Sequence, residues 1–161
     1  MTTPTITSPP PAPPASPEAP PARAAADDPG PATTPAEVAA SFYDAFLADD
    51  LIGASALLDP DVVLHVPGAN PVAGDHEGLD AVLGWVLTSQ AITREGTVDT
   101  RVVDLGGGAT HATAICEVTG ERPGRSVMHN RTIHVLRVDA GRIAEIWFHN
   151  WDQPSVDAFW S

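Results

Sequence analysis

In Thr132-Ile-His-Val-Leu-Arg-Val-Asp-Ala-Gly-Arg-Ile-Ala-Glu-Ile-Trp147, apolar and polar residues alternate on both sides of a glycine-containing turn. A period of two is typical of strands that bury one face. The turn Asp139-Ala-Gly141 has the composition that joins two antiparallel strands. The segment therefore predicts a long β-hairpin.

The elements before and after this hairpin are predicted from helix-capping residues and from the spacing of apolar residues. Thr34-Pro-Ala-Glu37 has the pattern of a capping box and begins a first helix. A second helix is expected from Leu51 to Leu58, then a strand over 62–66, a turn-rich connection over 69–78 and a third helix from Leu79 to about residue 90. Three more strands are expected near 95–105, 109–121 and 126–138, a fourth over 142–151, and a last short helix after Asp152. The predicted fold is α+β, with three N-terminal helices packed on a curved, mainly antiparallel sheet and a short C-terminal helix.

The first 35 residues have a different composition from the rest. They hold 12 of the 17 prolines and only Ile6 as a large aliphatic residue. Such a segment buries too little apolar area to offset its ordering entropy, so we expect a disordered tail over 1–35 and one domain over 36–161. The tail should be removable without a change in melting temperature. No stretch has the length of a signal peptide core or a membrane span, which favours a cytoplasmic protein.

Charge and cysteine content exclude several classes. The chain has a net charge of −13, and its eight basic residues are all arginine. This balance disfavours nucleic acids and anionic membranes as partners. The single Cys116 excludes a disulfide scaffold and is expected to be a buried structural thiol. The six histidines lack the spacing of a metal site, so we expect neither a metal nor another cofactor.

Several motifs in order resemble the NTF2-like superfamily, and within it the SnoaL-like polyketide cyclases and the ketosteroid isomerases. The resemblance covers residues 36–161. It rests on Phe42-Tyr-Asp-Ala-Phe46, His65-Val-Pro-Gly68, Ala73-Gly-Asp-His-Glu-Gly78, Ile133-His-Val-Leu-Arg-Val138, Gly141 to Trp147 and the ending from Asp152-Gln153 to Phe159-Trp160. It implies a cone-shaped fold around one apolar pocket.

The resemblance also implies a set of site residues. The isomerase general base falls at or beside His65, its oxyanion acid at His134 and its oxyanion tyrosine at Phe42, with Tyr43 one residue away. Asp152 is the match to the acid of the cyclases. The replacement of both carboxyls by histidine and of the phenol by Phe42 argues against a steroid isomerase proper.

The alternation of side chains along the strands predicts part of the pocket lining independently of the resemblance. His134 shares a face with Met128, Asn130 and Leu136, and Ile146, Phe148 and Asn150 share a face of the next strand. Trp85 flanks the third helix. The expected pocket is lined by Phe42, Trp85, Met128, Asn130, Leu136, Ile146, Phe148 and Asn150.

Three functions remain open from the sequence. The first is a cofactor-independent cyclase or isomerase for a small, largely apolar, polyketide-like carbonyl substrate, in which His65 removes a proton, His134 stabilises the enolate and Asp152 returns a proton. The second is a pocket that binds a ligand or partner without turnover. The third is an epoxide hydrolase, although its Asp-Arg-Asp cluster is not matched.

Each predicted site residue also has a structural alternative. A histidine in an apolar strand is often only hydrogen-bonded, and Asp152 is well placed to cap the last helix. A homodimer is expected through an open sheet face bearing Val127, His129, Ile133 and Val135.

Overall fold

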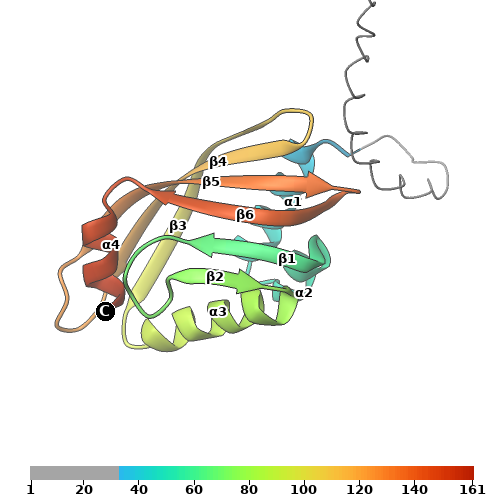
Figure 1. Cartoon of the computed structure of the whole chain (residues 1–161). Helices are drawn as coiled ribbons and strands as arrows, with labels where there is room; N and C mark the ends of the chain where they lie inside the picture. Colours follow the sequence, from blue (N-terminus) through green and yellow to red (C-terminus); the bar gives the residue numbers. More distant parts are fainter. Residues whose placement is uncertain (1–32) are drawn as a thin grey trace, which may run out of the picture. The chain divides into compact units, whose positions relative to one another are not determined.

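The computed structural model describes residues 33–161, which fold into one curved sheet with helices against it (Figure 1). The sheet has six strands in the order β2-β1-β6-β5-β4-β3. Only β1 and β6 pair in parallel, and the other neighbours are antiparallel. The α+β class and the mainly antiparallel sheet agree with the sequence prediction.

Two helices precede the first strand. α1 (Pro35–Leu47) begins with the predicted capping box, in which the Thr34 side chain and the Glu37 side chain each bond the other's backbone N–H. α2 (Leu51–Ala56) is capped by the Asp50 carboxylate, which accepts the Gly53 N–H at 2.9 Å. Thr34 is the N-cap of α1, and Pro35 is its first residue and is buried.

The third helix is separated from the first two by a pair of strands. β1 (Leu58–Val66) starts where the sequence suggested the end of a helix, and β2 (Gly74–Glu77) lies within the expected turn-rich connection. α3 (Leu79–Ile92) then packs on β1 and β2. The description of three N-terminal helices is thus corrected: two helices precede the sheet, and the third follows two strands, of which only the first was predicted. The second, β2, has four mainly polar residues and offered no periodic signal.

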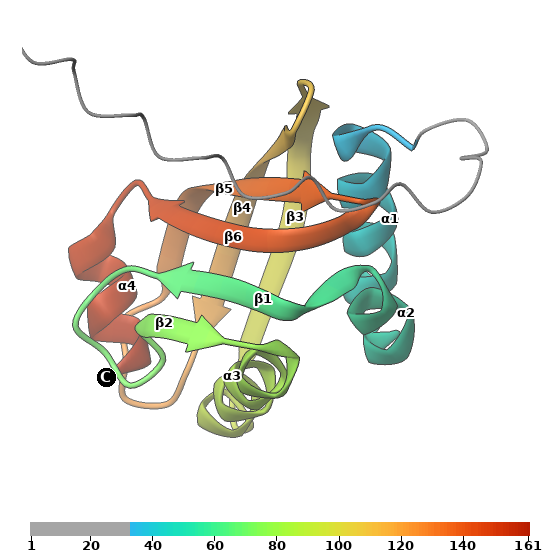
Figure 2. The ribbon, with the colours of Figure 1, turned by 45° about the vertical axis from the view of Figure 1, so that its right-hand side comes forward.

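The remaining strands form a meander. β3 (Thr97–Gly107), β4 (His111–Glu121), β5 (Met128–Asp139) and β6 (Arg142–Asn150) lie within a few residues of the predicted ranges. The quoted hairpin is β5 and β6, and its turn uses positive φ angles at Ala140 and Gly141. α4 (Gln153–Trp160) follows and packs on β5 (Figure 2).

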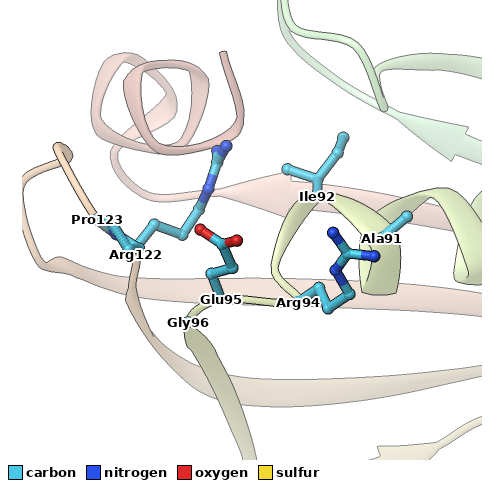
Figure 3. Close-up of a pocket in the computed structure, with 7 residues that line it drawn as sticks. All are labelled: Ala91, Ile92, Arg94, Glu95, Gly96, Arg122 and Pro123. Carbon is cyan, nitrogen blue, oxygen red and sulfur yellow. The ribbon is translucent and has the colours of Figure 1, made fainter.

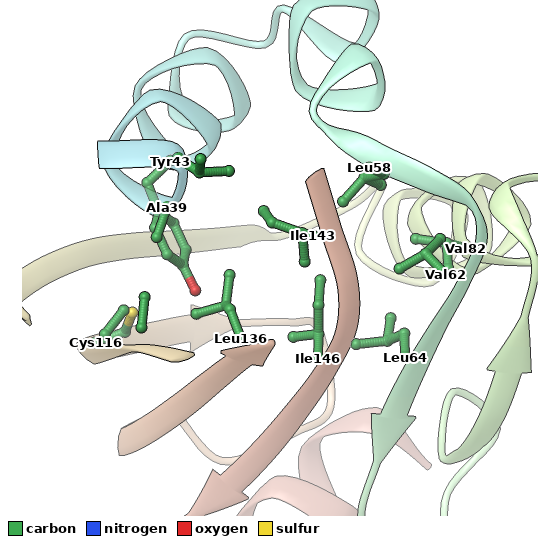
Figure 4. Packing of buried hydrophobic residues seen from close by; sticks show 13 residues of the cluster. Ala39, Tyr43, Leu58, Val62, Leu64, Val82, Cys116, Leu136, Ile143 and Ile146 are labelled. Carbon is green, nitrogen blue, oxygen red and sulfur yellow. The ribbon is translucent and has the colours of Figure 1, made fainter. Parts of the chain in front are cut away.

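The main core lies between α1 and the sheet and extends to α3. Its most buried side chains include Ala39 of α1 and, on the strands, Val62, Leu64, Cys116, Leu136 and Ile143, and Val82 of α3 is also buried in it. Figure 4 shows Tyr43 reaching from α1 toward the strands that carry Cys116 and Leu136. The buried Cys116 thiol fits the structural role expected from the sequence.

The predicted tail over residues 1–35 falls almost entirely outside the described residues. Within residues 33–161, no helix is long and apolar enough to cross a membrane.

Candidate functional site

A cavity of about 550 Å³ lies between the helices and the inner face of the sheet. This volume is within the range of small-molecule sites. Its walls are mainly apolar, because the inward positions of β1, β5 and β6 and the facing sides of α1, α3 and α4 carry large hydrophobic residues. They include Phe42, Phe46, Leu64, Val66, Val82, Leu83, Trp85, Val86, Met128, Ile146, Phe148, Val156 and Trp160.

The most distinctive polar feature of the wall is a bond between Tyr43 and His134. The Tyr43 hydroxyl lies 2.7 Å from His134 Nδ1, and both residues line the cavity. The imidazole also stacks on Phe148 at a centroid distance of 3.8 Å. Tyr43 and His134 are only 5% and 8% exposed, so their bond is shielded from bulk water. We call these two residues the Tyr43–His134 pair.

Burial keeps the pair uncharged near neutral pH. It lowers the pKa of His134 to about 3, with a smaller contribution from His149, and raises the pKa of Tyr43 well above its ordinary value. Burial also raises the pKa of the Cys116 thiol to about 11, and its Sγ lies 3.9 Å from His134 Nδ1. At neutral pH the cavity therefore presents neither a thiolate nor an imidazolium from these residues.

A neutral pair leaves one polar hydrogen for a ligand. Tyr43 has one O–H and neutral His134 has one N–H, and the shared bond uses one of these two hydrogens. Neither Tyr43 Oη nor His134 Nε2 has another hydrogen-bond partner among residues 33–161. In either tautomer, the pair can donate one more hydrogen bond. An uncharged donor in an apolar cavity is suited to a carbonyl oxygen.

A row of side-chain amides lies at the α4 end of the cavity. Asn130 donates to Asn150 at 2.8 Å, and Asn150 donates to Gln153 at 3.0 Å. Gln153 then donates to Asp157, which also accepts from Asn70. Burial works against ionisation of Asp157, but these donors outweigh it and lower the pKa of Asp157. The row therefore ties α4 to the strands, and the amides of Asn130 and Asn150 are largely committed to protein partners.

The exposed part of the lining is acidic. Asp49, after α1, and Asp99, on β3, both line the cavity and are exposed, as are Leu47, Gln90 and Val98 beside them. Among the described residues that line the cavity there is no arginine, and the chain contains no lysine. This charge pattern disfavours an anionic ligand.

His65 does not line the cavity, contrary to the sequence expectation. Leu64 and Val66 face inward, whereas His65 faces the opposite side of β1 and stacks on Trp147 at 5.4 Å. Its Nδ1 lies 2.7 Å from Asp75 and its Nε2 lies 3.0 Å from Glu145. Partial burial would lower the pKa of His65, but the two carboxylates together raise it. The prediction that both histidines titrate low in one cavity is therefore wrong for His65.

The alternation of side chains along β1 explains this error. In Val62-Val-Leu-His-Val66 the positions 62, 64 and 66 are all apolar, so the alternation already placed His65 on the outer face with Val63. The resemblance to isomerases outweighed that signal in the prediction.

The structure also places two other predicted site residues outside the cavity lining. Asp152 is exposed, does not line the cavity and accepts the Ser155 N–H at 3.2 Å as the cap of α4, which is the structural alternative foreseen for it. Leu136 is fully buried in the core and does not line the cavity.

The structure places the other expected residues in the lining: Phe42, Trp85, Met128, Asn130, His134, Ile146, Phe148 and Asn150. Sequence reasoning missed Tyr43 as a cavity residue. Its signal was the spacing of Pro35, Ala39 and Tyr43, which places all three on one side of α1.

A smaller pocket of about 160 Å³ lies beside the end of α3 (Figure 3). Its lining includes Arg94, Glu95 and Arg122. Arg122 bonds the Phe159 carbonyl and lies over the Phe159 ring, and thus holds α4 in place. Within residues 33–161, no cluster of three or more His, Cys, Asp or Glu side chains is arranged to hold a metal ion. The large cavity is therefore the candidate site.

Comparison with known proteins agrees with this fold. The model of the SnoaL-like domain family matches residues 39–146, which is most of the chain. The chain belongs to this family. No curated protein matches the chain.

Three solved structures illustrate the similarity. Bal32a from a soil-derived mobile gene cassette is 25% identical, with a TM-score of 0.73 over 78% of this chain and 95% of its own. A protein of unknown function with a cystatin-like fold from Xanthomonas campestris is 24% identical, with a TM-score of 0.71 over 78% and 96%. A proposed polyketide cyclase from Sinorhizobium meliloti is 21% identical, with a TM-score of 0.56 over 70% and 94%. Because the sequence identities of the last two structures are low, their similarity is evidence for the fold alone.

Proposed function

We propose that this protein binds a small, neutral, largely apolar carbonyl compound of the polyketide class in the cavity. The observation that carries the proposal is the buried Tyr43–His134 bond, which leaves one uncharged donor toward a ligand. The carbonyl oxygen of the ligand accepts this hydrogen bond while its rings contact the aromatic and aliphatic walls. The absence of arginine from the described lining, together with the acidic rim, favours a ligand without negative charge.

A second candidate is catalysis of proton transfer next to that carbonyl. A hydrogen bond that strengthens as the oxygen becomes an enolate would lower the barrier to removal of the neighbouring proton. Because His65 lies on the outer face of the sheet, it is not the base that we propose. The carboxylates in the described lining are those of Asp49 and Asp99 at the rim, and Asp99 on β3 is the base to test. Binding without turnover is the better supported function, since the carboxylates of the described lining lie at its exposed rim and neither is hydrogen-bonded to the buried pair.

Binding is tested with 1-tetralone, a neutral bicyclic ketone, and with tetralin, which lacks the carbonyl oxygen. We expect the wild type to bind 1-tetralone more tightly than tetralin. The double variant Tyr43→Phe/His134→Phe removes both possible donors of the pair and should lose most of this difference, because a hydrogen bond of this kind contributes about 1 kcal/mol, or roughly fivefold in affinity. Calorimetric titration measures the affinities for both compounds. Equal preference for the ketone in the wild type and the double variant would contradict the proposal.

Catalysis is tested by deuterium exchange into 1-tetralone at the carbon next to its carbonyl. If the protein is an enzyme, the wild type accelerates exchange, and the double variant Tyr43→Phe/His134→Phe and the variant Asp99→Asn each slow it. Exchange at the buffer rate with a bound ketone would leave binding as the function.

We also propose that the outer sheet face pairs with a second copy of the chain. Val63, Ile115, Ile133, Val135 and Trp147 lie on this face, opposite the cavity, and are only half-buried in one chain. A contiguous apolar surface of this kind is typical of a subunit contact.

A further inference from the structure

The His134 ring presents one nitrogen to Tyr43 and the other to the cavity. Its Nδ1 lies 2.7 Å from the Tyr43 hydroxyl, whereas Nε2 has no hydrogen-bond partner among residues 33–161. Across the same residues, the Ser89 hydroxyl is the one fully covered side-chain nitrogen or oxygen atom without a partner. Nε2 also lacks a partner, so it is not fully covered, and His134 lines the cavity. A ligand in the cavity can therefore contact Nε2.

The direction of the Tyr43–His134 bond decides which hydrogen is left for a ligand. If the Nδ1–H donated to Tyr43 Oη, the Tyr43 O–H would need an acceptor of its own, and none lies within hydrogen-bond distance among residues 33–161. A buried hydroxyl without an acceptor costs free energy. If instead the Tyr43 O–H donates to Nδ1, the one hydrogen left is on the accessible Nε2. The second arrangement pairs every polar group of the pair that the protein covers.

Aromatic contacts fix the orientation of the His134 ring. The imidazole stacks on Phe148 at a centroid distance of 3.8 Å and an interplanar angle of 20°. It also stacks on the Tyr43 ring at 6.1 Å and 24°. Because an N–H bond lies in the plane of its ring, these contacts also fix the direction of the Nε2–H. A ligand oxygen must then approach the edge of the imidazole rather than its face.

We infer that the His134 Nε2–H is the donor to the ligand, and that Tyr43 is a positioning residue that holds His134 in this tautomer without itself donating to the ligand. The inference rests on the proposed function and divides its single hydrogen bond between two roles. The hydrogen bond at one imidazole nitrogen sets which nitrogen carries the proton. The ligand atom is thus a hydrogen-bond acceptor that lies near the plane of the imidazole.

Cys116 provides a matched control for Tyr43. Its Sγ lies 3.9 Å from His134 Nδ1, so it is a second neighbour of the same nitrogen. Cys116 is fully buried and does not line the cavity. Tyr43→Phe removes the proposed donor to Nδ1, whereas Cys116→Ala removes only the thiol beside it.

Nitrogen-15 NMR of the ligand-free protein near neutral pH tests the tautomer, because protonated and unprotonated ring nitrogens have distinct chemical shifts. The His134 signals are those absent from His134→Gln. We expect a protonated Nε2 and an unprotonated Nδ1 in the wild type. Tyr43→Phe should change the Nδ1 chemical shift clearly, because the nitrogen loses its donor, and Cys116→Ala should leave it nearly unchanged. A protonated Nδ1 in the wild type, or a larger shift in Cys116→Ala than in Tyr43→Phe, would overturn the inference.

The infrared C=O stretching frequency of bound 1-tetralone tests which residue donates to the ligand. We expect Tyr43→Phe to keep a lower frequency than the double variant Tyr43→Phe/His134→Phe, because the Nε2–H is still present. Its affinity for 1-tetralone should fall by no more than about twofold, the loss expected if both tautomers of His134 become equally populated.

The outcomes separate the inference from the proposed function. If Tyr43→Phe has the frequency of the double variant while the wild type has a lower one, Tyr43 is the donor to the ligand. The inference is then overturned, and the proposed function stands. If the wild type has the frequency of the double variant, or if 1-tetralone does not bind, the proposed function is overturned and the inference with it.

Discussion

At the residue scale, two histidines that look alike in the sequence have opposite environments. His134 lies in an apolar cavity, and His65 lies between two carboxylates on the outer face. Strand alternation was sufficient to predict the face of His134 on β5. The same alternation in β1 also indicated that His65 faces outward, but the resemblance to the isomerases favoured a position in the cavity. The contact between Tyr43 and His134 joins residues 91 positions apart, so it could not be predicted before the helix packed on the sheet.

The buried His134 should make stability fall in acid. The unfolded chain takes up a proton at this histidine near its ordinary pKa of 6.5, whereas the folded protein does so only near 3. Stability from this residue is therefore full above about pH 6.5 and decreases toward pH 3, by up to about 1.4 kcal/mol per pH unit. In urea titrations between about pH 5 and about pH 7, His134→Gln should show a shallower pH dependence than wild type. Parallel curves for the two proteins would refute the assignment.

His65 should act with the opposite sign. Its pKa is raised in the folded protein by Asp75 and Glu145, so its contribution is present below its ordinary pKa of 6.5 and is lost as the pH rises through the raised value. His65→Gln should reduce stability at about pH 6 more than at about pH 9, measured by urea unfolding. It should leave the binding of 1-tetralone unchanged. A loss of binding comparable to that in the double variant Tyr43→Phe/His134→Phe would return His65 to the site.

At the element scale, composition and periodicity predicted the helices and the meander because these elements are long and patterned. They did not predict β2, whose Gly74-Asp-His-Glu77 is short and polar and is recognisable only through its pairing with β1. Composition and periodicity also placed the start of β1 too late in the sequence, since Asp59-Pro60 is more typical of a helix end than of a strand.

The docking of α4 depends on a glycine in β4. A Cβ atom at Gly120 would lie 2.6 Å from the Phe159 ring and 3.2 Å from Met128, and both side chains are buried. Gly120→Ala should therefore destabilise the domain by about 1–3 kcal/mol. Because Val156 and Trp160 of α4 line the cavity, it should also weaken ketone binding.

Gly84 in α3 is the matched control for this substitution. It is exposed, and a Cβ atom there would have no neighbour within 4 Å. Gly84→Ala should stabilise the domain by about 0.5–1 kcal/mol, because alanine is the better helix former. The two variants are compared by chemical denaturation. Similar effects of the two substitutions would show that α4 does not pack tightly on Gly120.

At the scale of the whole molecule, the curved sheet has one face toward the cavity and one face toward solvent. We expect static light scattering to give about twice the 16.8 kDa of one chain for the 161-residue protein at micromolar concentration. Val135→Glu places a charge on the outer face of β5 and should return the mass to that of one chain while ketone binding is retained. A monomer mass for the wild type would contradict the proposed subunit contact.

The central claim is that the Tyr43–His134 pair donates a hydrogen bond to a carbonyl oxygen inside the cavity. The infrared C=O stretching frequency of bound 1-tetralone tests it most directly, because a hydrogen bond to the oxygen lowers this frequency. We predict a lower frequency in the complex with wild type than in the complex with the double variant Tyr43→Phe/His134→Phe, which lacks both possible donors, each recorded at saturating protein concentration. The same frequency in both complexes would show that the ketone does not accept a hydrogen bond from the pair, and would contradict the proposed site.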